Sequence, residues 1–542
     1  MTTPTTTPPP ERSRRSLPTI RLEHLWVALA LSVVGVFIGL VPTTPNDFWW
    51  HLKVGELIAD GGIPTTNLFA WTLPADTPYV YQSWLGEWLF ALLYRLGGLP
   101  LTVFARNGLG LAAFALVALE ARQRSGSWRL AAGAVLLAAA MAINNLTTRT
   151  QNWSWVPFVL TFLVFSGYTR GTLRGRWLAG LPLLMLFWVN GHGAFVMGLL
   201  VGGAFVVGEG LRRLLRQPYA LTWERLRALS IAWIAMIGAT LVNPLGIGIF
   251  GYVQKLLEDS PSQSLIKEWQ SPTPRTPAGM FFYLGILAVI AAFAFARRRP
   301  TITDVLLVCG LAWQAFVGIR YVVWFGMVAL PIVAQCLAPP RPVFRPASDG
   351  SSSSSPPSPP PRRKPPSRRE RGGGTVAHLV VLVGLGLAVV SVQPWFKPWL
   401  PLPQPYQGLF APVPGAPLLF SSDTPVAATS HLQAEPCAGR LFNEMGYGSY
   451  LVWALYPPAQ VFIDPRVELY PMSLWQDYLA LTRGHDNEVE QLLRHYDIAC
   501  VVLDRGLQPH LSEAMAALSG WQRTFGDDRS EVWRRVRVIP LP

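Results

Sequence analysis

A carboxylate and an imidazole lie four residues apart in the segment DFWWH, where Asp47 and His51 would share one face of a helix. At this spacing the two groups could transfer a proton or bind a metal ion. The segment follows the apolar run Leu25–Val41, so a second interpretation needs no chemistry. In that interpretation Asp47 caps the helix, while Trp49 and Trp50 anchor it at the membrane interface. The segment alone leaves both interpretations open.

A second polar interruption, WVNGHGAF, lies between two apolar runs and contains Asn190 and His192. Its glycines let the backbone approach another group closely. A tight turn between two membrane spans explains the glycines but not the histidine. Asn190 and His192 are therefore candidates for binding a substrate.

Two arginines lie beside apolar runs and have few acids near them in the sequence. Arg149 follows a run that ends in NNLTTRT, and Arg320 separates two others. Each could bind a phosphate group through two hydrogen bonds or extend to the lipid headgroups. Glu268 and Trp269 lie near the end of a long polar stretch that begins at residue 241. This stretch is either a loop that closes over a site or a surface feature.

The composition shows where these residues must be positioned. Only 14% of the 542 residues are charged and 51% are hydrophobic, whereas soluble domains carry about 25% charged residues. The chain is therefore mostly embedded in a membrane. The segment 84–98 is apolar but short, which favours a helix at the interface. Eleven other apolar segments are long enough, or nearly long enough, to span: residues 22–41, 99–121, 130–146, 152–168, 177–190, 193–210, 228–243, 279–296, 302–319, 321–338 and 375–393.

The basic residues test this arrangement. With the N-terminus inside and the spans alternating, every basic cluster falls on the inner side. This distribution accounts for the net charge of +14 without nucleic acid as a partner. Because ionisable groups at membrane depth tend to line a cavity or pathway, we expect the polar residues of the outer side to converge on one site. These residues are Asp47, His51, Glu56, Glu87, Arg106, Arg149, Gln151, Asn190, His192, Asn243, Glu268, Trp269 and Arg320.

The predicted fold is an all-α polytopic membrane protein with a small soluble α/β domain at its C-terminus. In that domain the segments 459–469 and 498–504 have the pattern of buried strands. The segment 440–455 is predicted as a first helix and 488–496 as a second, and 521–538 has the pattern of a hairpin. Cys437 and Cys500 could form a disulfide if the domain lies outside the cytosol. The predicted divisions are a disordered cytoplasmic tail at 1–21, a membrane body at 22–338 with a first outer loop at 42–98, a disordered cytoplasmic linker at 339–374, a final span at 375–393 and the outer domain at 394–542.

The order of several motifs resembles bacterial membrane proteins grouped with the GT-C glycosyltransferases. The resemblance covers most of the chain after residue 40. It implies a GT-C fold, in which a multi-span helical body carries an acidic residue in its first outer loop. The motifs are DFWWHLKVGELI with QSWLGEWLFALLYRLGG, RTQNWSW, LPLLMLFWVNGHGAFVMG, NPLG with IKEWQSP, GIRYVVWFGMVALP, FNEMGYGSYLVWAL with VFIDPRVELY, and GWQRTFGDDRSEVW.

Such enzymes include protein O-mannosyltransferases, aminoarabinose transferases and oligosaccharyltransferases. The resemblance implies transfer of a sugar from a polyprenyl-phosphate-linked donor to a glycan, lipid or protein acceptor on the outer side of the plasma (inner) membrane. It implies that the carboxylate of Asp47 is catalytic, either as the general base or as the group that orients the acceptor hydroxyl. His51 is a candidate partner of Asp47. Arg149 or Arg320 would meet the lipid phosphate and stabilise the leaving charge, and inversion at the anomeric carbon is expected.

The sequence departs from the family pattern at the first-loop acid. Characterised members often have a second acid adjacent to it, but Asn46 precedes Asp47 here, and the nearby carboxylates are Glu56 and Glu87. A divalent cation could take part, but nothing in the sequence indicates one. The cofactor is therefore left unknown and no metal ligands are predicted.

Two other functions stay open. A transporter or flippase of a lipid-linked solute would place its polar groups near the bilayer midplane, often in two repeats. The polar residues here gather at one face, and no repeat is found in the sequence. A non-catalytic scaffold would instead use the outer domain to bind a partner or a glycan. In that domain Asp464 and Arg466 would form either a binding edge or a local ion pair.

Overall fold

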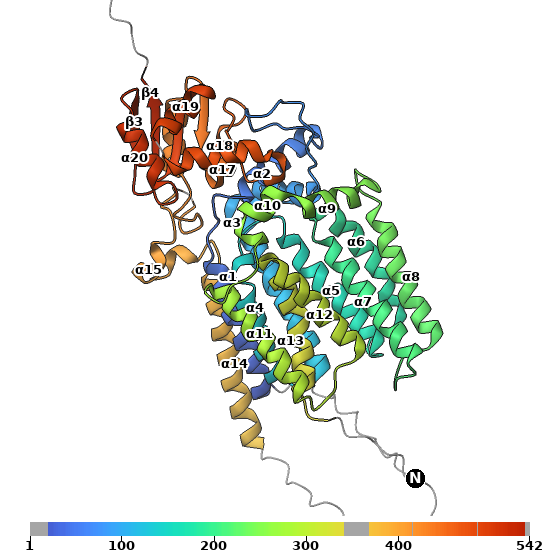
Figure 1. Cartoon of the computed structure of the whole chain (residues 1–542). Coiled ribbons are helices and arrows are strands. Elements are labelled where there is room, and N and C mark those ends of the chain that lie inside the picture. Colours follow the sequence, from blue (N-terminus) through green and yellow to red (C-terminus); the bar gives the residue numbers. More distant parts are fainter. Residues whose placement is uncertain (1–19, 341–367, 415, 485, 537–542) are drawn as a thin grey trace, which may run out of the picture.

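The structure is a helical body with a smaller α/β domain at one end (Figure 1). The computed structural model describes residues 20–340, 368–414, 416–484 and 486–536, so most of the predicted tail and linker lies outside the described residues. The body contains α1 (Leu22–Leu40), α2 (Phe48–Gly61), α3 (Trp84–Ser125), α4 (Trp128–Met141), α5 (Asn152–Thr169), α6 (Gly180–Gly191), α7 (Phe195–Leu214), α8 (Trp223–Thr240), α9 (Gly248–Glu258), α10 (Ser260–Leu265), α11 (Pro277–Ala294), α12 (Ile302–Val317), α13 (Val322–Leu337) and α14 (Arg368–Ser391).

Each of the eleven predicted membrane segments consists mainly of one of these helices. Within the described residues, five helices are long and apolar enough to cross a membrane: α1, α3, α7, α11 and the continuous helix Ile319–Leu337 that contains α13. Three shorter apolar helices accompany them, at Trp128–Met141, Ile302–Val317 and Val376–Ser391. The protein is therefore a membrane protein, and the count of eleven spans stays a prediction.

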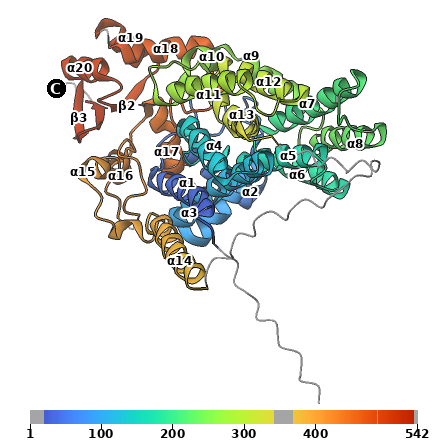
Figure 2. The same cartoon turned by 90° about the horizontal axis from the view of Figure 1, so that it is seen from below.

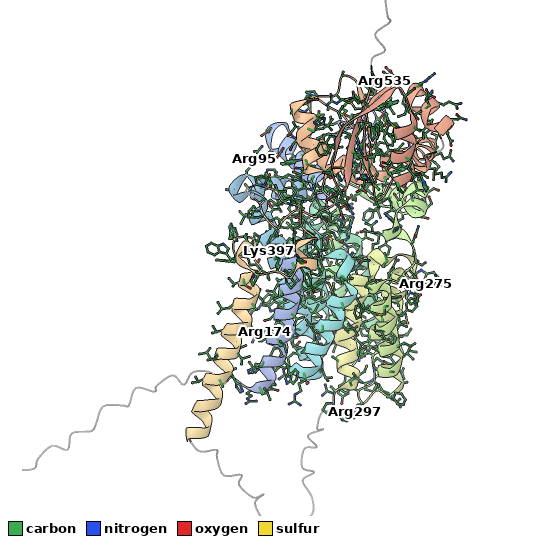
Figure 3. The ribbon with its side chains drawn as sticks, turned by 90° about the vertical axis from the view of Figure 1, so that its left-hand side faces the viewer. Arg95, Arg174, Arg275, Arg297, Lys397 and Arg535 are labelled. Atoms are coloured by element: carbon green, nitrogen blue, oxygen red, sulfur yellow. A yellow bond between two sulfur atoms is a disulfide. The ribbon has the colours of Figure 1, made fainter. Side chains whose placement is uncertain are left out.

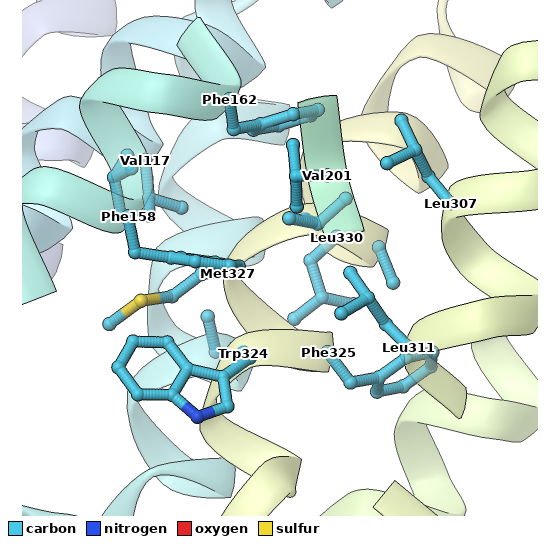
Figure 4. Close-up of a cluster of buried hydrophobic side chains, with 14 of the residues drawn as sticks. Val117, Phe158, Phe162, Val201, Leu307, Leu311, Trp324, Phe325, Met327 and Leu330 are labelled. Atoms are coloured by element: carbon cyan, nitrogen blue, oxygen red, sulfur yellow. The ribbon is translucent and has the colours of Figure 1, made fainter. Parts of the chain in front are cut away.

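Helix α13 forms the centre of the body. It is apolar on all sides and packs against α3, α4, α11 and α12, as expected for a helix enclosed by others. Phe158 of α5 contacts Trp324 of α13, with ring centroids 4.8 Å apart, and Val201 of α7 and Leu307 of α12 belong to the same cluster (Figure 4). Figure 2 shows the surrounding helices from below. This core fixes the helices whose outer ends carry the polar residues.

Two helical segments meet within α3 at a kink. Gly97 and Gly98 have non-helical dihedral angles, and the φ of 64° at Gly98 is one that favours glycine. Pro100 follows in the first turn of the second segment, where its missing N–H costs no helical hydrogen bond. The predicted short helix at 84–98 is thus confirmed as a segment separate from the span that follows it.

Buried ion pairs join the predicted inner loops at one end of the body. Arg124 donates to Glu120 at 2.6 Å and to Asp304 at 2.8 Å, and Arg170 donates to Glu120 at 2.8 Å. Figure 3 shows Arg297 at this end and the α/β domain at the other. Within the described residues, the basic segments around Arg124, Arg170 and Arg298 therefore lie at the same end of the body, as their distribution in the sequence predicted.

The α/β domain contains a four-stranded sheet in the order β1-β2-β4-β3. Strands β1 (Arg440–Asn443) and β2 (Ile498–Asp504) are parallel, whereas β4 (Ser530–Arg535) is antiparallel to both β2 and β3 (Trp521–Gly526). The predicted strand at 498–504, the helix at 488–496 and the hairpin are confirmed, and Cys437 and Cys500 form a disulfide. The helices are α15 (Gln404–Gln407), α16 (Val426–Ala434), α17 (Met445–Leu455), α18 (Met472–Arg483), α19 (Asp486–His495) and α20 (Pro509–Ala517).

One predicted strand of this domain is wrong. The segment 459–469 does not join the sheet: Val461 makes an isolated bridge to Ala70 of the first outer loop, and Val467–Leu469 form a 3-10 turn, η6. The segment is apolar because the outer loop covers it. The first strand is instead β1, at the first four residues of the segment predicted as a helix at 440–455, and that helix begins at Met445 as α17. Because β1 has only four residues and two of them, Arg440 and Asn443, are polar, it lacks the continuous apolar run by which β2 was found.

Candidate active site

Helix α2 has Asp47 at its start and lies between the helical body and the α/β domain. It packs against α3 on one side and α17 on the other. The backbone N–H of Trp50 donates to the Ser449 hydroxyl at 2.9 Å, and the ring of Trp49 stacks on Phe420 at 5.0 Å. The predicted anchoring of both tryptophans in the lipid interface is therefore wrong, because the α/β domain buries them.

Asp47 occupies the N-cap position of α2, but its side chain makes no capping hydrogen bond. Its φ of 51° lies in the left-handed region, which few non-glycine residues adopt and which is common at functional sites. The cap prediction is thus right about the position and wrong about the bond. The carboxylate points to Arg149 instead, with its Oδ2 3.7 Å from Nη1 of that residue.

Close packing of α2 on α3 brings His51 to Glu87. His51 Nδ1 donates to Glu87 Oε1 at 2.8 Å, and its Nε2 lies 3.4 Å from the Thr150 hydroxyl. Glu87 is 1% exposed, and its Oε2 has no hydrogen-bond partner among the described residues. A buried carboxylate therefore orients the imidazole, an arrangement that suits a histidine that moves protons.

We predict that Gly55→Ala separates α2 from α3 and destabilises the protein. A Cβ added at Gly55 would lie 2.0 Å from the carbonyl oxygen of Glu87, and backbone cannot move aside as a flexible side chain can. Overpacking of this kind typically costs about 1–3 kcal/mol. Gly61→Ala in the same helix is the control, because no described atom lies within 4 Å of a Cβ there. Equal unfolding temperatures of the two purified variants would contradict the close contact.

Arg149 connects Asp47 to the long polar loop. Its Nη1 lies 2.9 and 2.8 Å from the two carboxylate oxygens of Glu268, and its Nη2 donates to the carbonyl of Asn144. The prediction that acids are scarce around Arg149 is wrong, because the fold brings Glu268 to it from 119 positions away. Arg149 is neutralised by that carboxylate, so it orders the site rather than offering a free cation to a phosphate.

These charges set the acidity of the two carboxyl groups. Although 37% of the Asp47 side chain is exposed, burial by the surrounding protein raises its pKa above the usual range. Arg149 opposes this shift and the charge of Glu268 adds to it. Burial would also raise the pKa of Glu268, but the charge and hydrogen bonds of Arg149 outweigh it, so that pKa is lowered. Asp47 is thus the more basic carboxylate, which suits a group that takes a proton.

Arg320 offers a cation that no acid of the described residues pairs with. It lies in the 3-10 turn η4 (Ile319–Tyr321), where its guanidinium packs over the ring of Trp269, 4.2 Å from the centroid. Its charge acts on Asp47, Glu268 and His192. Among the described residues the guanidinium makes no ion pair or hydrogen bond. Arg320 is therefore the arginine available to an anionic ligand, and Trp269 holds it in place.

His192 is a neutral hydrogen-bonded imidazole at the break between α6 and α7. The N–H of Ala194 donates to its Nδ1 at 3.0 Å, and the Ser154 hydroxyl lies 3.1 Å from the same atom. Because Nδ1 accepts, Nε2 carries the proton. Burial lowers the pKa of His192 well below the usual range, and the charge of Arg320 adds to this effect. His192 can therefore donate a hydrogen bond from Nε2 without adding charge.

Two predicted substrate-binding residues have other roles. The Oδ1 of Asn190 accepts from Trp84 Nε1 at 2.8 Å, and its Nδ2 donates to the carbonyls of Leu186 and Val242, which joins α3, α6 and the segment after α8. Glu56 forms an ion pair with Lys53 at 3.4 Å, on a different face of α2 from His51. Asn190 positions the site, and Glu56 lies outside it.

The geometry does not fit a divalent cation. The described residues contain no group of three or more His, Cys, Asp or Glu side chains that could bind a metal ion. The carboxylate of Glu268 is held by Arg149, and that of Glu87 by His51. No step proposed below depends on a metal.

Sequence reasoning missed Thr150 and Ser154, whose hydroxyls contact the two histidines of the site. Both lie in the motif RTQNWSW together with Arg149, so the clustering of polar side chains just before a membrane span was the available signal. It also missed Glu468, which reaches the first outer loop through Tyr79. No local pattern indicates that contact, because 389 residues separate the two side chains.

Comparison with known proteins gives matches among solved structures only. No protein-family model and no curated protein matches the chain. The archaeal oligosaccharyltransferase AglB from Archaeoglobus fulgidus, in complex with an inhibitory peptide and a dolichol-phosphate, is similar at 12% identity and a TM-score of 0.46, over 96% of this chain and 75% of that chain. ArnT from Cupriavidus metallidurans bound to undecaprenyl phosphate is similar at 16% identity and a TM-score of 0.47, over 96% and 99%. ArnT from the same organism in the apo state is similar at 16% identity and a TM-score of 0.48, over 96% of this chain and 98% of that chain.

Oligosaccharyltransferases are among the enzymes that the sequence motifs resemble. Because each TM-score is below 0.5, these likenesses do not say which reaction this chain performs. The reaction follows from the chain's own side chains.

Proposed function

We propose that this protein transfers a sugar from a polyprenyl-phosphate-linked donor to an acceptor at the outer end of its helical body. One observation carries the proposal: Asp47 lies 3.7 Å from Arg149, which binds Glu268, and the adjacent Trp269 holds the guanidinium of Arg320, which has no ion-pair partner among the described residues. The buried pair of His51 and Glu87 lies on the other side of Arg149, where His51 contacts Thr150. Substitution at an anomeric carbon needs a base for the incoming hydroxyl and a cation for the leaving phosphate. The site supplies both at the edge of the membrane, where a lipid-linked donor would lie.

In the proposed reaction the acceptor oxygen forms a bond to the anomeric carbon while the bond from that carbon to the donor phosphate oxygen breaks. Asp47 takes the proton of the acceptor hydroxyl. Arg320 stabilises the charge on the departing polyprenyl phosphate, and His192 donates a hydrogen bond from Nε2 to an oxygen of the donor. Arg149 and Glu268 hold Asp47 in position, and the transfer inverts the anomeric carbon.

The proposed location is the plasma (inner) membrane, with a cytoplasmic N-terminus and the α/β domain on the outer side. The basic loops at the opposite end of the body support this orientation, because cytoplasmic loops collect Lys and Arg. The disulfide between Cys437 and Cys500 supports it independently, since such bonds persist in oxidising compartments. The first outer loop contacts the α/β domain, so both lie on the same side.

The function is tested with purified protein in proteoliposomes and a radiolabelled polyprenyl-phosphate sugar. We expect label to move into a membrane or cell-envelope acceptor fraction, with release of unlabelled polyprenyl phosphate. Movement of the labelled lipid across the bilayer without cleavage of the sugar–phosphate bond would contradict the proposal and indicate a flippase. Absence of both cleavage and movement would leave a binding role for the α/β domain.

The pH dependence of transfer should report the ionisation of Asp47. The base must be deprotonated, so activity should fall as pH drops through a pKa above the usual value for aspartate, which is about 3.9. Because Arg149 lowers this pKa, Arg149→Met should move the acidic limb of kcat/KM to higher pH. Glu268 raises it, so Glu268→Gln should move the limb to lower pH.

The opposite signs of these two shifts make the measurement specific. A general loss of folding would lower the rate of both variants at every pH without moving the limb. Shifts in the same direction, or no shift in either variant, would exclude Asp47 as the group that titrates.

A further inference from the structure

A cavity of about 690 Å³ lies between three parts of the chain that are distant in sequence. Its walls are the first outer loop, helix α9 with the segment before it, and the turn η6 of the α/β domain. This volume is within the range of about 300–1,000 Å³ that is typical of small-molecule sites. The reaction proposed above uses none of its polar residues.

The lining combines aromatic rings with a few polar groups. Tyr79, Tyr81 and Trp84 come from the first outer loop and the start of α3, and Tyr252 comes from α9. Glu468 of η6 lines the same cavity, and the hydroxyl of Tyr79 donates to its Oε1 at 2.9 Å. Burial raises the pKa of the Glu468 carboxyl, and the hydrogen bond from Tyr79 and the charge of Arg466 oppose this shift. The cavity therefore offers flat apolar faces together with one carboxylate, three phenols and the ammonium group of Lys255.

The cavity adjoins the candidate active site. Gln82, which lines the cavity, donates to the carbonyl of Val189, three residues before His192. Trp84 donates to Asn190, two residues before it. The field at Tyr252 includes the charges of Glu468, Glu87 and Arg320, which belong to the cavity on one side and to the active site on the other. A ligand in the cavity would therefore lie beside the proposed reaction centre.

We infer that this cavity binds a sugar ring, with Glu468 and Tyr252 hydrogen-bonded to its hydroxyl groups. A sugar ring presents C–H groups on its faces, which favour the negative face of an aromatic ring, and hydroxyls on its edge, which a carboxylate accepts in pairs. The inference rests on the proposed function, because a sugar transferase must hold a sugar beside its base. The sugar belongs either to the acceptor or to the donor.

Two other ligands fit the lining less well. A phosphate group would be repelled by Glu468, and Lys255, the cation of the lining, has an exposed side chain. A polyprenyl tail has no hydrogen bonds to offer, so it would cover the half-buried carboxylate of Glu468 without replacing its contacts with water. A neutral molecule rich in hydroxyls satisfies both the aromatic faces and the polar groups.

Binding is tested directly with the full-length protein in nanodiscs by saturation-transfer difference NMR. The probes are methyl α-D-mannopyranoside, methyl β-D-galactopyranoside and methyl N-acetyl-β-D-glucosaminide. We expect at least one probe to bind, and Glu468→Gln to weaken its binding by about tenfold or more, since hydrogen bonds to charged groups contribute about 1.5–3 kcal/mol. Tyr252→Phe, which removes one hydroxyl, should weaken binding less.

Glu258→Gln is the matched control, because it makes the same glutamate-to-glutamine change at an exposed residue outside the cavity, in α9, the helix that carries Tyr252. It should bind the probe as the wild type does. Equal binding by the wild type, Glu468→Gln and Tyr252→Phe would overturn the inference, and so would the absence of binding by the wild type for every probe.

The transfer assay separates the two sources of the sugar. If Glu468→Gln raises the KM for the acceptor but leaves hydrolysis of the donor by water unchanged, the cavity holds the acceptor sugar. If it raises the KM for the donor in hydrolysis, the cavity holds the donor sugar. Probe binding that depends on Glu468 in a protein without any transferase activity would keep the sugar site and refute the proposed function alone.

Discussion

Asp47→Asn should slow sugar transfer by about 10²–10⁴-fold, the usual contribution of a general base. The amide has nearly the shape of the carboxylate but cannot take the proton of the acceptor. The Asp47 side chain makes no capping hydrogen bond, so the change removes none. The loss should appear in kcat, because other residues bind the donor. Single-turnover transfer from a radiolabelled donor measures it.

Glu56→Gln provides the matched control for this experiment. It removes one negative charge from the same helix, but Glu56 pairs with Lys53 outside the site. We expect transfer within about twofold of the wild type, since among the described residues neither Glu56 nor its partner Lys53 contacts the residues of the site. Retention of more than about a tenth of the activity by Asp47→Asn would exclude Asp47 as the base. A loss confined to His51→Ala would then assign the proton transfer to the imidazole.

Arg466→Met should destabilise the protein by about 3–5 kcal/mol, the usual cost of removing one partner of a buried ion pair. Arg466 and Asp464 are fully buried, and two hydrogen bonds of 2.9 and 2.7 Å join them. The variant leaves the Asp464 charge without compensation. Arg466 also donates to the Tyr81 hydroxyl and to Asn67 of the first outer loop, so transfer activity should fall together with stability.

Arg494→Met is the control, because it breaks an ion pair with Glu490 in which both side chains are largely exposed. Thermal unfolding of the purified full-length proteins should show little change for this variant. Adding Asp464→Asn to Arg466→Met should recover part of the lost stability, since the uncompensated charge is then gone. Equal unfolding temperatures of Arg466→Met and Arg494→Met would contradict the role assigned to the buried pair.

The residues of the site could be found from the sequence because topology alone sorts them. The predicted helical spans and the positions of the Arg clusters assign each loop to one side of the membrane. This assignment places Asp47, Arg149, His192 and Arg320 on the predicted outer side. The structure brings three of these residues together: Asp47 lies 3.7 Å from Arg149, and Arg149 binds Glu268, whose neighbour Trp269 packs against Arg320. The predicted topology therefore grouped residues that lie near one another in the structure.

The partners of these residues could not be found in this way. Whether Arg149 is free depends on Glu268, which lies in a loop whose path no local pattern specifies. Trp49 has the amphipathic character of an interfacial residue, and only the α/β domain, far along the chain, decides that it is buried. Segment 459–469 has the composition of a strand because it is buried, but its cover is a loop. An apolar sequence pattern predicts that a segment is buried, but it does not predict which helix, strand or loop packs against the segment.

The contact between α2 and α17 has a consequence for biogenesis. Trp50 and its hydrogen-bond partner Ser449 are 399 residues apart, so the helix that starts with Asp47 gains its last packing surface only when synthesis is nearly complete. At a synthesis rate of about 5–20 residues per second, on the order of 20–80 s pass between the synthesis of Trp50 and that of Ser449. With the proposed function and orientation, a ribosome-bound nascent chain would therefore not react with donor lipid, and transfer would begin only after the α/β domain had reached the outer side.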